Sequence, residues 1–259
     1  MAPAKGDVMP LLDKLYPGPI RRIENTSVRR VVLGAIVGVV VLAVALVALI
    51  AVTLLRSDDP ALATNAPPLP AGASGTASAQ GSTPLHFVVD TGSQVKTVVR
   101  EQLTVAPVPS NAVSIAPGIT GDLYLTKDGL ASGQKSTFTV DLLSLKSDEA
   151  LRDRAMRGSL ATDRFPTAKF TIDSITGFPA NYSGGKEVEM TITGSMTIRE
   201  AIKPLTFKVY ARQGGDFLTA IADTDFKMSE FGITPPNASI TRVEDGVHMQ
   251  VTLIAKLAK

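Results

Sequence analysis

The feature that most constrains the fold is a period-two alternation of apolar and polar side chains through residues 85–259. In this pattern successive side chains point to opposite faces of a strand, so each strand has one apolar face and one polar face. The clearest examples are the stretches 85–89, 95–100, 119–125, 168–173, 188–193, 205–209, 217–221 and 247–253. Strands that are apolar on one side must roll up or stack to bury that side. The pattern therefore predicts a mainly β domain, either a barrel or a sandwich.

One stretch interrupts the alternation with the signals of a helix. Ser147 is a residue type that caps helix N-termini, acidic side chains follow it in the first turn, and Gly158 lies where a helix would end. We expect a helix over 148–157. Leu151 and Ala155 are four residues apart and share one of its faces, so the helix is expected to lie across one end of the sheet assembly.

A long apolar stretch precedes this domain. Residues 31–55 contain no charged side chain, and as a helix they would be about 37 Å long, enough to cross a hydrocarbon core of about 30 Å. Basic side chains are concentrated before the stretch, at Lys5, Lys14, Arg21, Arg22, Arg29 and Arg30. By the positive-inside rule, residues 1–30 are cytoplasmic and the rest of the chain is extracytoplasmic. We therefore expect a single-pass protein of the cell membrane.

A cleaved signal peptide is the alternative, since Ala61 and Ala63 resemble a cleavage site. Secretory apolar regions usually have about 7 to 15 residues, which favours an uncleaved transmembrane helix over 31–55. The following segment, 56–84, is rich in Ala, Pro, Gly, Ser and Thr and has few large apolar side chains. Such a composition cannot bury enough apolar surface to fold alone, so 56–84 is predicted to be a disordered linker to the folded domain at 85–259.

Composition excludes several functions. The chain has no Cys, which rules out disulfides, cysteine metal ligands and thiol nucleophiles. Its 26 basic and 24 acidic side chains give a net charge of only +2, and Trp is absent. Nucleic-acid binding normally needs a basic surface or a platform of stacked aromatic side chains. We therefore expect no nucleic-acid partner.

Candidate catalytic side chains are few. His86 and His248 are the two histidines of the chain, and both fall on the polar face of a predicted strand, so we expect them at the surface. Asp223 and Asp225 are two residues apart and would share a face in a strand, which could form a carboxylate pair, although marking a strand end is the commoner role. No nucleotide-binding or hydrolase motif is present. We predict no catalytic site, no metal site and no cofactor.

Glu101 departs from the pattern because it shares the face of Val95 and Val99. In a regular strand its carboxylate would point inward. Burial of an unpaired charge costs several kcal/mol, so we expect Glu101 to lie at a rim, to pair with an arginine such as Arg152, or to be protonated.

The segment 143–170, LSLKSDEALRDRAMRGSLATDRFPTAKF, resembles the signature of the YceI-like family of extracytoplasmic lipid- and polyisoprenoid-binding domains. The similar features are a Ser-Leu turn, an Arg-Asp helix and the aromatic-Pro-x-Ala-x-Phe entry into the next strand. Further similarity extends over nearly all of 85–259. Segment 107–117 departs from the family and is interpreted as an altered connection.

The resemblance implies an eight-stranded antiparallel, lipocalin-like barrel that holds a polyisoprenoid or similar lipid in a hydrophobic tunnel. Combined with the inward parity of the strands, it nominates eight wall residues: Phe87, Val99, Leu123, Phe138, Phe170, Ile192, Phe207 and Met249. A barrel of eight strands is at the size where its own side chains can fill it. The alternative is therefore a filled barrel that acts as a structural or interaction module of the cell envelope. The oligomeric state stays open, with a homodimer among the alternatives.

Overall fold

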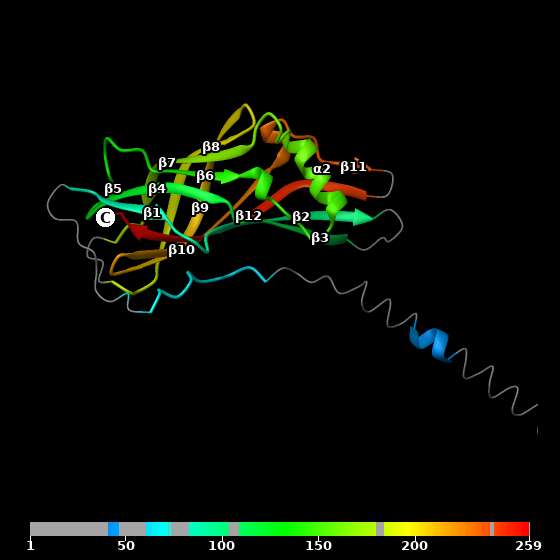
Figure 1. Ribbon diagram of the computed structural model, residues 1–259, viewed down its shortest axis with the longest axis horizontal. Helices are drawn as coiled ribbons and strands as arrows, with labels where there is room; N and C mark the ends of the chain where they lie inside the picture. The colour runs from blue at the N-terminus through cyan, green and yellow to red at the C-terminus, as the bar shows by residue number, and fades with distance from the viewer. Residues whose placement is uncertain are drawn as a thin grey trace, which may run out of the picture. The chain divides into compact units, whose positions relative to one another are not determined.

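The strands with one apolar face close into a barrel. In the computed structural model, which describes residues 41–46, 61–71, 73, 83–103, 109–179, 184–238 and 241–258, the first strand of the domain pairs on both of its edges and completes a ring. The strands of the ring, in order around the barrel, are β1 (Leu85–Val89), β4 (Ile119–Thr126), β6 (Thr137–Asp141), β7 (Thr167–Thr176), β8 (Val188–Ile198), β9 (Ala201–Gly214), β10 (Phe217–Lys227) and β12 (Thr241–Leu257). Each neighbouring pair is antiparallel (Figure 1).

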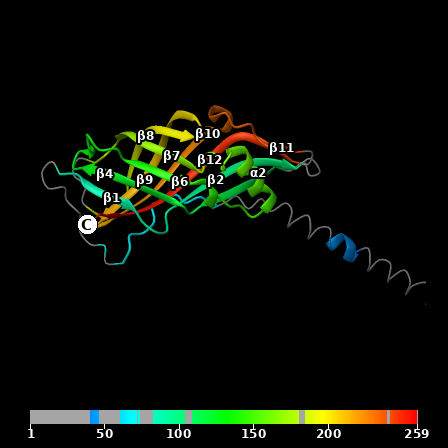
Figure 2. The ribbon, with the colours of Figure 1, turned by 45° about the horizontal axis from the view of Figure 1, so that its top comes forward.

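A hairpin extends the barrel beyond the ring. Strand β2 (Gln94–Leu103) pairs with the same edge of β12 that β1 uses, and β3 (Pro109–Ala116) pairs with β2. The short strands β5 (Gly129–Leu130) and β11 (Asn237–Ala238) pair with β4 and β12. The barrel therefore has two distinct ends: the helix end, where the β2–β3, β6–β7, β8–β9 and β10–β12 connections lie, and the terminal end, with the β9–β10 turn and the C-terminus (Figures 1 and 2).

Helical segments occur in two of the connections at the helix end. The β6–β7 connection holds the 3₁₀ helix η1 (Leu142–Ser144) and the α-helix α2 (Ala150–Leu160), and the β10–β12 connection holds η2 (Met228–Phe231). The predicted helix exists, but its bounds and caps were wrong. Ser147 does not cap it; its hydroxyl and its backbone N–H both donate to Asp153 at 2.7 Å. The helix runs through Gly158 and ends at Ala161, which takes the left-handed conformation at φ 49°.

All eight predicted strands lie within observed strands. Of the two predicted architectures, barrel and sandwich, the structure has the barrel. One interpretation was wrong. Segment 107–117, expected to be an altered connection, contains the regular strand β3, whose far edge meets Lys146 through a bridge at Ile115. Its alternating Val113 and Ile115 are the strand signal that the prolines at either end concealed.

The predicted transmembrane helix lies mostly outside the described residues. Residues 41–46 are helical, and their large apolar side chains are exposed. In the part of the chain that the structure describes, no helix has both the length and the apolar character needed to span a bilayer.

Part of the predicted linker is ordered. Residues 61–71, which we call the strap, lie along the outer face of the barrel. The backbone of Ala63 makes two hydrogen bonds with the amide side chain of Gln250, each 2.9 Å long. The backbone N–H of Ala66 donates to the carboxylate of Glu187 at 2.7 Å.

The strap buries side chains that point away from the barrel interior. Thr219 and Ile221 face outward on β10 and are both 0% exposed, and the hydroxyl of Thr219 donates to the carbonyl of Pro67 at 2.7 Å. A buried hydroxyl normally has a hydrogen-bond partner, which the strap supplies here. The prediction of disorder over 56–84 was therefore wrong for 61–71, because it considered the segment alone and not the surface that receives it.

A glycine on the inner face of β8 makes room for an aromatic ring. A Cβ atom at Gly194 would lie 2.6 Å from the ring of Phe170 and would also contact the carbonyl oxygen of Thr171. Real Cβ atoms do not approach other atoms this closely. Because Gly194 has no Cβ, strands β7 and β8 can pair with each other while the Phe170 ring packs over their inner surface.

We expect Gly194→Ala to lower the free energy of unfolding by about 1 to 3 kcal/mol, since overpacking forces the ring or the strands to shift. Gly158→Ala is the matched control, because no atom lies within 4 Å of a Cβ placed there; it should be neutral or stabilising by up to about 1 kcal/mol. Urea unfolding followed by circular dichroism measures both. Equal stability of the two variants would contradict this account of Gly194.

Candidate functional site

The barrel encloses a cavity of about 720 Å³. Its walls come from the inward-facing positions of the strands and from one side of α2. Functional pockets typically have volumes of about 300 to 1,000 Å³, so the cavity is large enough for a small organic ligand. The alternative of a barrel filled by its own side chains is therefore wrong.

Small side chains on the inner surface create much of this space. Valine, leucine, isoleucine, phenylalanine and methionine form most of the wall, but alanines recur between them, at Ala112, Ala116, Ala168, Ala211, Ala220 and Ala222. An alanine places only a methyl group in the interior, so these positions leave free volume that larger side chains would fill.

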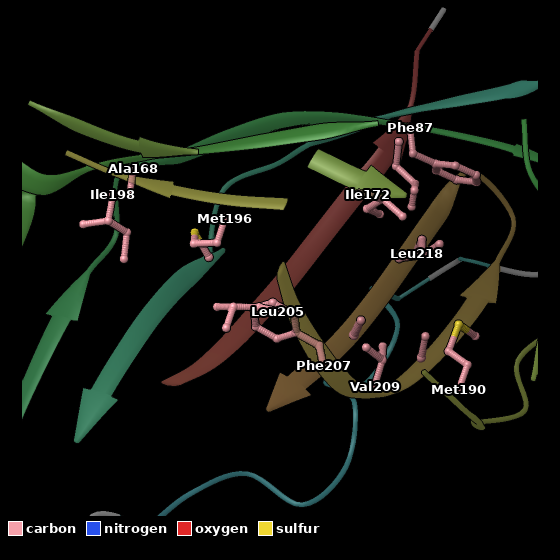
Figure 3. Close-up of a cluster of buried hydrophobic side chains, with 14 of the residues drawn as sticks. Phe87, Ala168, Ile172, Met190, Met196, Ile198, Leu205, Phe207, Val209 and Leu218 are labelled. Atoms are coloured by element: carbon pink, nitrogen blue, oxygen red, sulfur yellow. The ribbon is translucent and has the colours of Figure 1, made fainter. Parts of the chain in front are cut away.

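Seven of the eight predicted wall residues line the cavity: Val99, Leu123, Phe138, Phe170, Ile192, Phe207 and Met249. The rings of Phe170 and Phe207 meet edge to face, with centroids 4.9 Å apart. Figure 3 shows Phe207 among the side chains that point into the interior. Phe87 is the exception, since it is fully buried in the apolar cluster and does not line the cavity. Contact of any of these residues with a ligand stays a prediction.

Helix α2 supplies wall residues that the strand pattern did not identify. Met156 and Leu160 face the cavity, and the hydroxyl of Ser114 on β3 donates to the sulfur of Met156 at 3.1 Å. No residue of α2 is buried. The helical spacing of these side chains was visible in the sequence, but not the strand that the helix faces.

The cavity opens beside α2. Among the lining residues, three are exposed, and all three belong to this helix or its N-cap: Glu149, Leu151 and Ala155. The lining residues at the terminal end, such as Phe178 and Gln213, are half-buried. We call the opening at the helix end, formed by α2 and the neighbouring connections, the mouth.

A buried ion pair lies at the mouth, on a cavity wall that is mostly apolar. Glu101 points inward from β2 and is buried, and its carboxylate accepts a hydrogen bond of 2.7 Å from the guanidinium of Arg152 on α2. The same guanidinium also contacts Asp148. Of the three environments expected for Glu101, the structure has the pair with Arg152.

The charges of this cluster reinforce one another. Burial lowers the pKa of Arg152, but the hydrogen bonds and negative charges of Glu101 and Asp148 outweigh burial and raise it above its usual value. The guanidinium is therefore always charged, and it attaches α2 to the barrel wall. The positive charge of Arg152 balances the negative charge of Glu101. The pair therefore gives the mouth polar groups without a large net charge.

The other candidate chemical groups lie outside the cavity. Asp223 and Asp225 flank His248 on the outer face, with Asp225 at 2.9 Å from Nδ1 and Asp223 at 3.4 Å from Nε2. His86 contacts Asp122 at 2.7 Å and stacks on Tyr124. Both histidines are half-buried on the outer surface rather than fully exposed. Within the described ranges, no group of three or more His, Asp or Glu side chains is arranged to bind a metal.

Comparisons with known proteins found similarities to the barrel domain. A family profile described as YceI-like domain matches residues 87–255. No curated protein sequence matches the chain. A solved polyisoprenoid binding domain from Saccharophagus degradans is similar, with a TM-score of 0.53 and 13% identity, over 67% of this chain and 99% of that one. BcnA from Burkholderia cenocepacia has a TM-score of 0.49 and 22% identity, over 65% and 99%. At 13% identity, the similarity to the Saccharophagus degradans domain establishes the fold alone.

We expect Arg152→Met to destabilise the protein by about 3 to 5 kcal/mol, because it leaves the buried Glu101 carboxylate without its partner. Urea unfolding followed by circular dichroism measures the loss.

The double variant Glu101→Gln/Arg152→Met provides the control, since it removes both charges. Its loss of stability should be clearly smaller than that of Arg152→Met. Urea unfolding under the same conditions distinguishes the variants. Equal losses in the single and double variants would show that the ion pair does not hold α2 in place.

Proposed function

The chain belongs to the YceI-like family, and on this premise we propose that it is a membrane-tethered extracytoplasmic protein that holds a long apolar ligand, a polyisoprenoid or similar lipid, inside its barrel. The observation that carries the proposal is the cavity of about 720 Å³ with mostly apolar walls and a mouth beside α2. A solid core would give a more stable barrel, so the retained space is best explained by an occupant.

Burial of apolar surface supplies the binding free energy. Each Å² of ligand surface removed from water contributes about 25 cal/mol, so a few hundred Å² contribute several kcal/mol before the entropic costs of association. The walls offer few hydrogen-bond partners, which favours a hydrocarbon chain over a polar ligand. A hydroxyl or other small polar head group would lie near Glu101 and Arg152, where the polar groups of the cavity are concentrated at the mouth.

The tether rests on the sequence. Residues 31–55 have the length and apolar character of a membrane span, and the basic side chains before them favour a cytoplasmic N-terminus. A barrel held beside the bilayer could take its ligand from the outer leaflet, hold it or pass it on. The solved domain from Saccharophagus degradans, of the same fold, is described as polyisoprenoid binding, which supports this ligand class.

We expect Ile192→Trp to reduce the amount of lipid that co-purifies with the full-length protein, because the larger side chain occupies the cavity that Ile192 lines. Thr191→Trp is the matched control: it places the same side chain on the adjacent residue of β8, which is exposed. Solvent extraction and mass spectrometry measure bound lipid, and added prenols test uptake. The chain has no Trp, so each variant contains a single tryptophan. Its fluorescence emission should be blue-shifted in Ile192→Trp, where the side chain points into the cavity, and not in Thr191→Trp, where it is exposed.

If the unchanged protein carries no lipid and takes up no added prenol, the proposed function is wrong. If both tryptophan variants retain as much lipid as the unchanged protein, the ligand does not occupy this cavity.

The proposed topology has its own test. Because the chain has no Cys, single cysteines can be introduced and labelled in intact cells with a membrane-impermeant maleimide. Lys135→Cys, at an exposed position of the barrel, should be labelled directly. Lys5→Cys should be labelled only after the membrane is permeabilised. Labelling of Lys5→Cys and not of Lys135→Cys in intact cells would reverse the orientation, and labelling of both would reject a membrane span between them. Loss of residue 5 from the mature protein would establish a cleaved signal peptide.

A further inference from the structure

The strap has a defined direction on the barrel. Strand β12 runs from the helix end to the terminal end, and the strap is parallel to it: Ala63 contacts Gln250, whereas Leu69, later in the strap, lies against Gly214 at the β9–β10 turn. The N-terminal end of the strap therefore lies nearer to the helix end of the barrel than its C-terminal end does. The carbonyl of Ala61, the first residue of the strap, accepts a hydrogen bond of 3.1 Å from Lys96.

The contacts of the strap make it part of the barrel domain. The Leu69 side chain packs directly against Gly214. A Cβ atom added to this glycine would lie only 2.5 Å from Leu69 Cδ1. At Glu187, the hydrogen bond from Arg212 lowers the carboxyl pKa, and the N–H of Ala66 lowers it further against the opposing effect of burial. Glu187 is therefore ionised at neutral pH, and the charged group strengthens its hydrogen bond to the strap.

A docked strap leaves a very short connection to the predicted membrane span. The apolar stretch ends at residue 55, so only residues 56–60 separate it from the strap. Fully extended, they reach at most about 17 Å. A flexible linker over all of 56–84 would instead let the barrel move freely, with a root-mean-square reach of about 30 Å. If residues 31–55 are the anchor, a docked strap would hold the barrel closer to the bilayer than a flexible linker would, and would limit its rotation.

The mouth carries the chemistry of a membrane-contacting surface. Leu151, which lines the opening, is 77% exposed, and Ile202 at the β8–β9 turn is 65% exposed. Both lie at the helix end. Exposed Arg154 and Arg157 on α2 are offset by acidic side chains nearby, so the surface has no strong charge. Large exposed apolar side chains with balanced charges favour insertion into a lipid interface over attraction to anionic lipids.

We propose that the strap orients the barrel so that its mouth contacts the phospholipid bilayer, with Leu151 and Ile202 inserted at the interface. This inference rests on the proposed function, since it takes residues 31–55 as the membrane anchor. It adds that the lipid ligand passes directly between bilayer and cavity through the opening beside α2. The docked strap, rather than charge attraction, sets this orientation.

The test uses the full-length protein in vesicles of phosphatidylcholine that include brominated phosphatidylcholine, which quenches tryptophan fluorescence on contact. The chain has no Trp, so each variant carries a single probe. Leu151→Trp reports on the mouth, and Lys135→Trp reports on the exposed β5–β6 connection at the terminal end. We expect several-fold stronger quenching at the mouth. Equal quenching at the two ends would overturn the proposal.

A second pair of variants tests the strap. Ala66 is buried beside Glu187, so Ala66→Glu should detach the strap by placing two carboxylates together. Ala71→Glu adds the same charge to the same segment at an exposed position. Combined with Leu151→Trp, Ala66→Glu should reduce quenching to the level of the terminal-end probe, whereas Ala71→Glu should leave it unchanged. Strong quenching that persists after Ala66→Glu would overturn the role of the strap.

Lipid content, measured on the unchanged protein by mass spectrometry, separates the two proposals. Bound lipid without quenching at the mouth would leave the binding function intact and reject the orientation. Quenching at the mouth without bound lipid would reject the binding function and leave the orientation intact. If the protein does not float with vesicles on a density gradient, the membrane anchor fails and the orientation is rejected with it.

Discussion

The structure depends on the pairing of one strand with two neighbours. Strand β1 joins β4 on one edge and β12 on the other, and this closes eight strands into a ring. Closure forces every apolar strand face toward a common axis, which is why the inward positions of distant segments meet. It also limits the diameter, so that side-chain volume decides whether the interior is solid or hollow. Here alanines on facing strands leave it hollow.

The cavity, the mouth and the ion pair form one connected arrangement. Because β2 and β3 extend beyond the ring, their inner surface needs a cover, and α2 provides it. Arg152 on the helix pairs with Glu101 on the strand, so the contact that holds the cover in place also forms the polar part of the opening. Apolar walls bind a hydrocarbon chain without directional preference, and the polar group at the mouth favours one end of the ligand over the other.

Much of the fold could be predicted from local pattern. The eight strand stretches and seven of the eight wall residues follow from side-chain parity, and the helix was predicted from residue types that cap helices and from a four-residue spacing. Both signals are properties of residues close together in the chain. The inward position of Glu101 was predicted in the same way. Strand β3 was not, because the prolines at its ends resemble a loop signal. Phe87 has the parity of a wall residue but is enclosed by others, and parity says only which way a side chain points.

The sequence by itself determined which face of each strand is apolar, where the long apolar stretch lies (31–55), and that the inward-pointing carboxylate of Glu101 needs a partner. Each of these depends on residues close together in the chain. Only the tertiary structure decided that the sheet encloses free volume, that Arg152 is the partner of Glu101, and that 61–71 is bound to the barrel. These depend on summed side-chain volumes and on contacts between segments far apart in sequence. For the strap, a composition typical of disorder was outweighed by a surface with matching hydrogen-bond groups, Gln250, Glu187 and Thr219, which no local pattern connects to it.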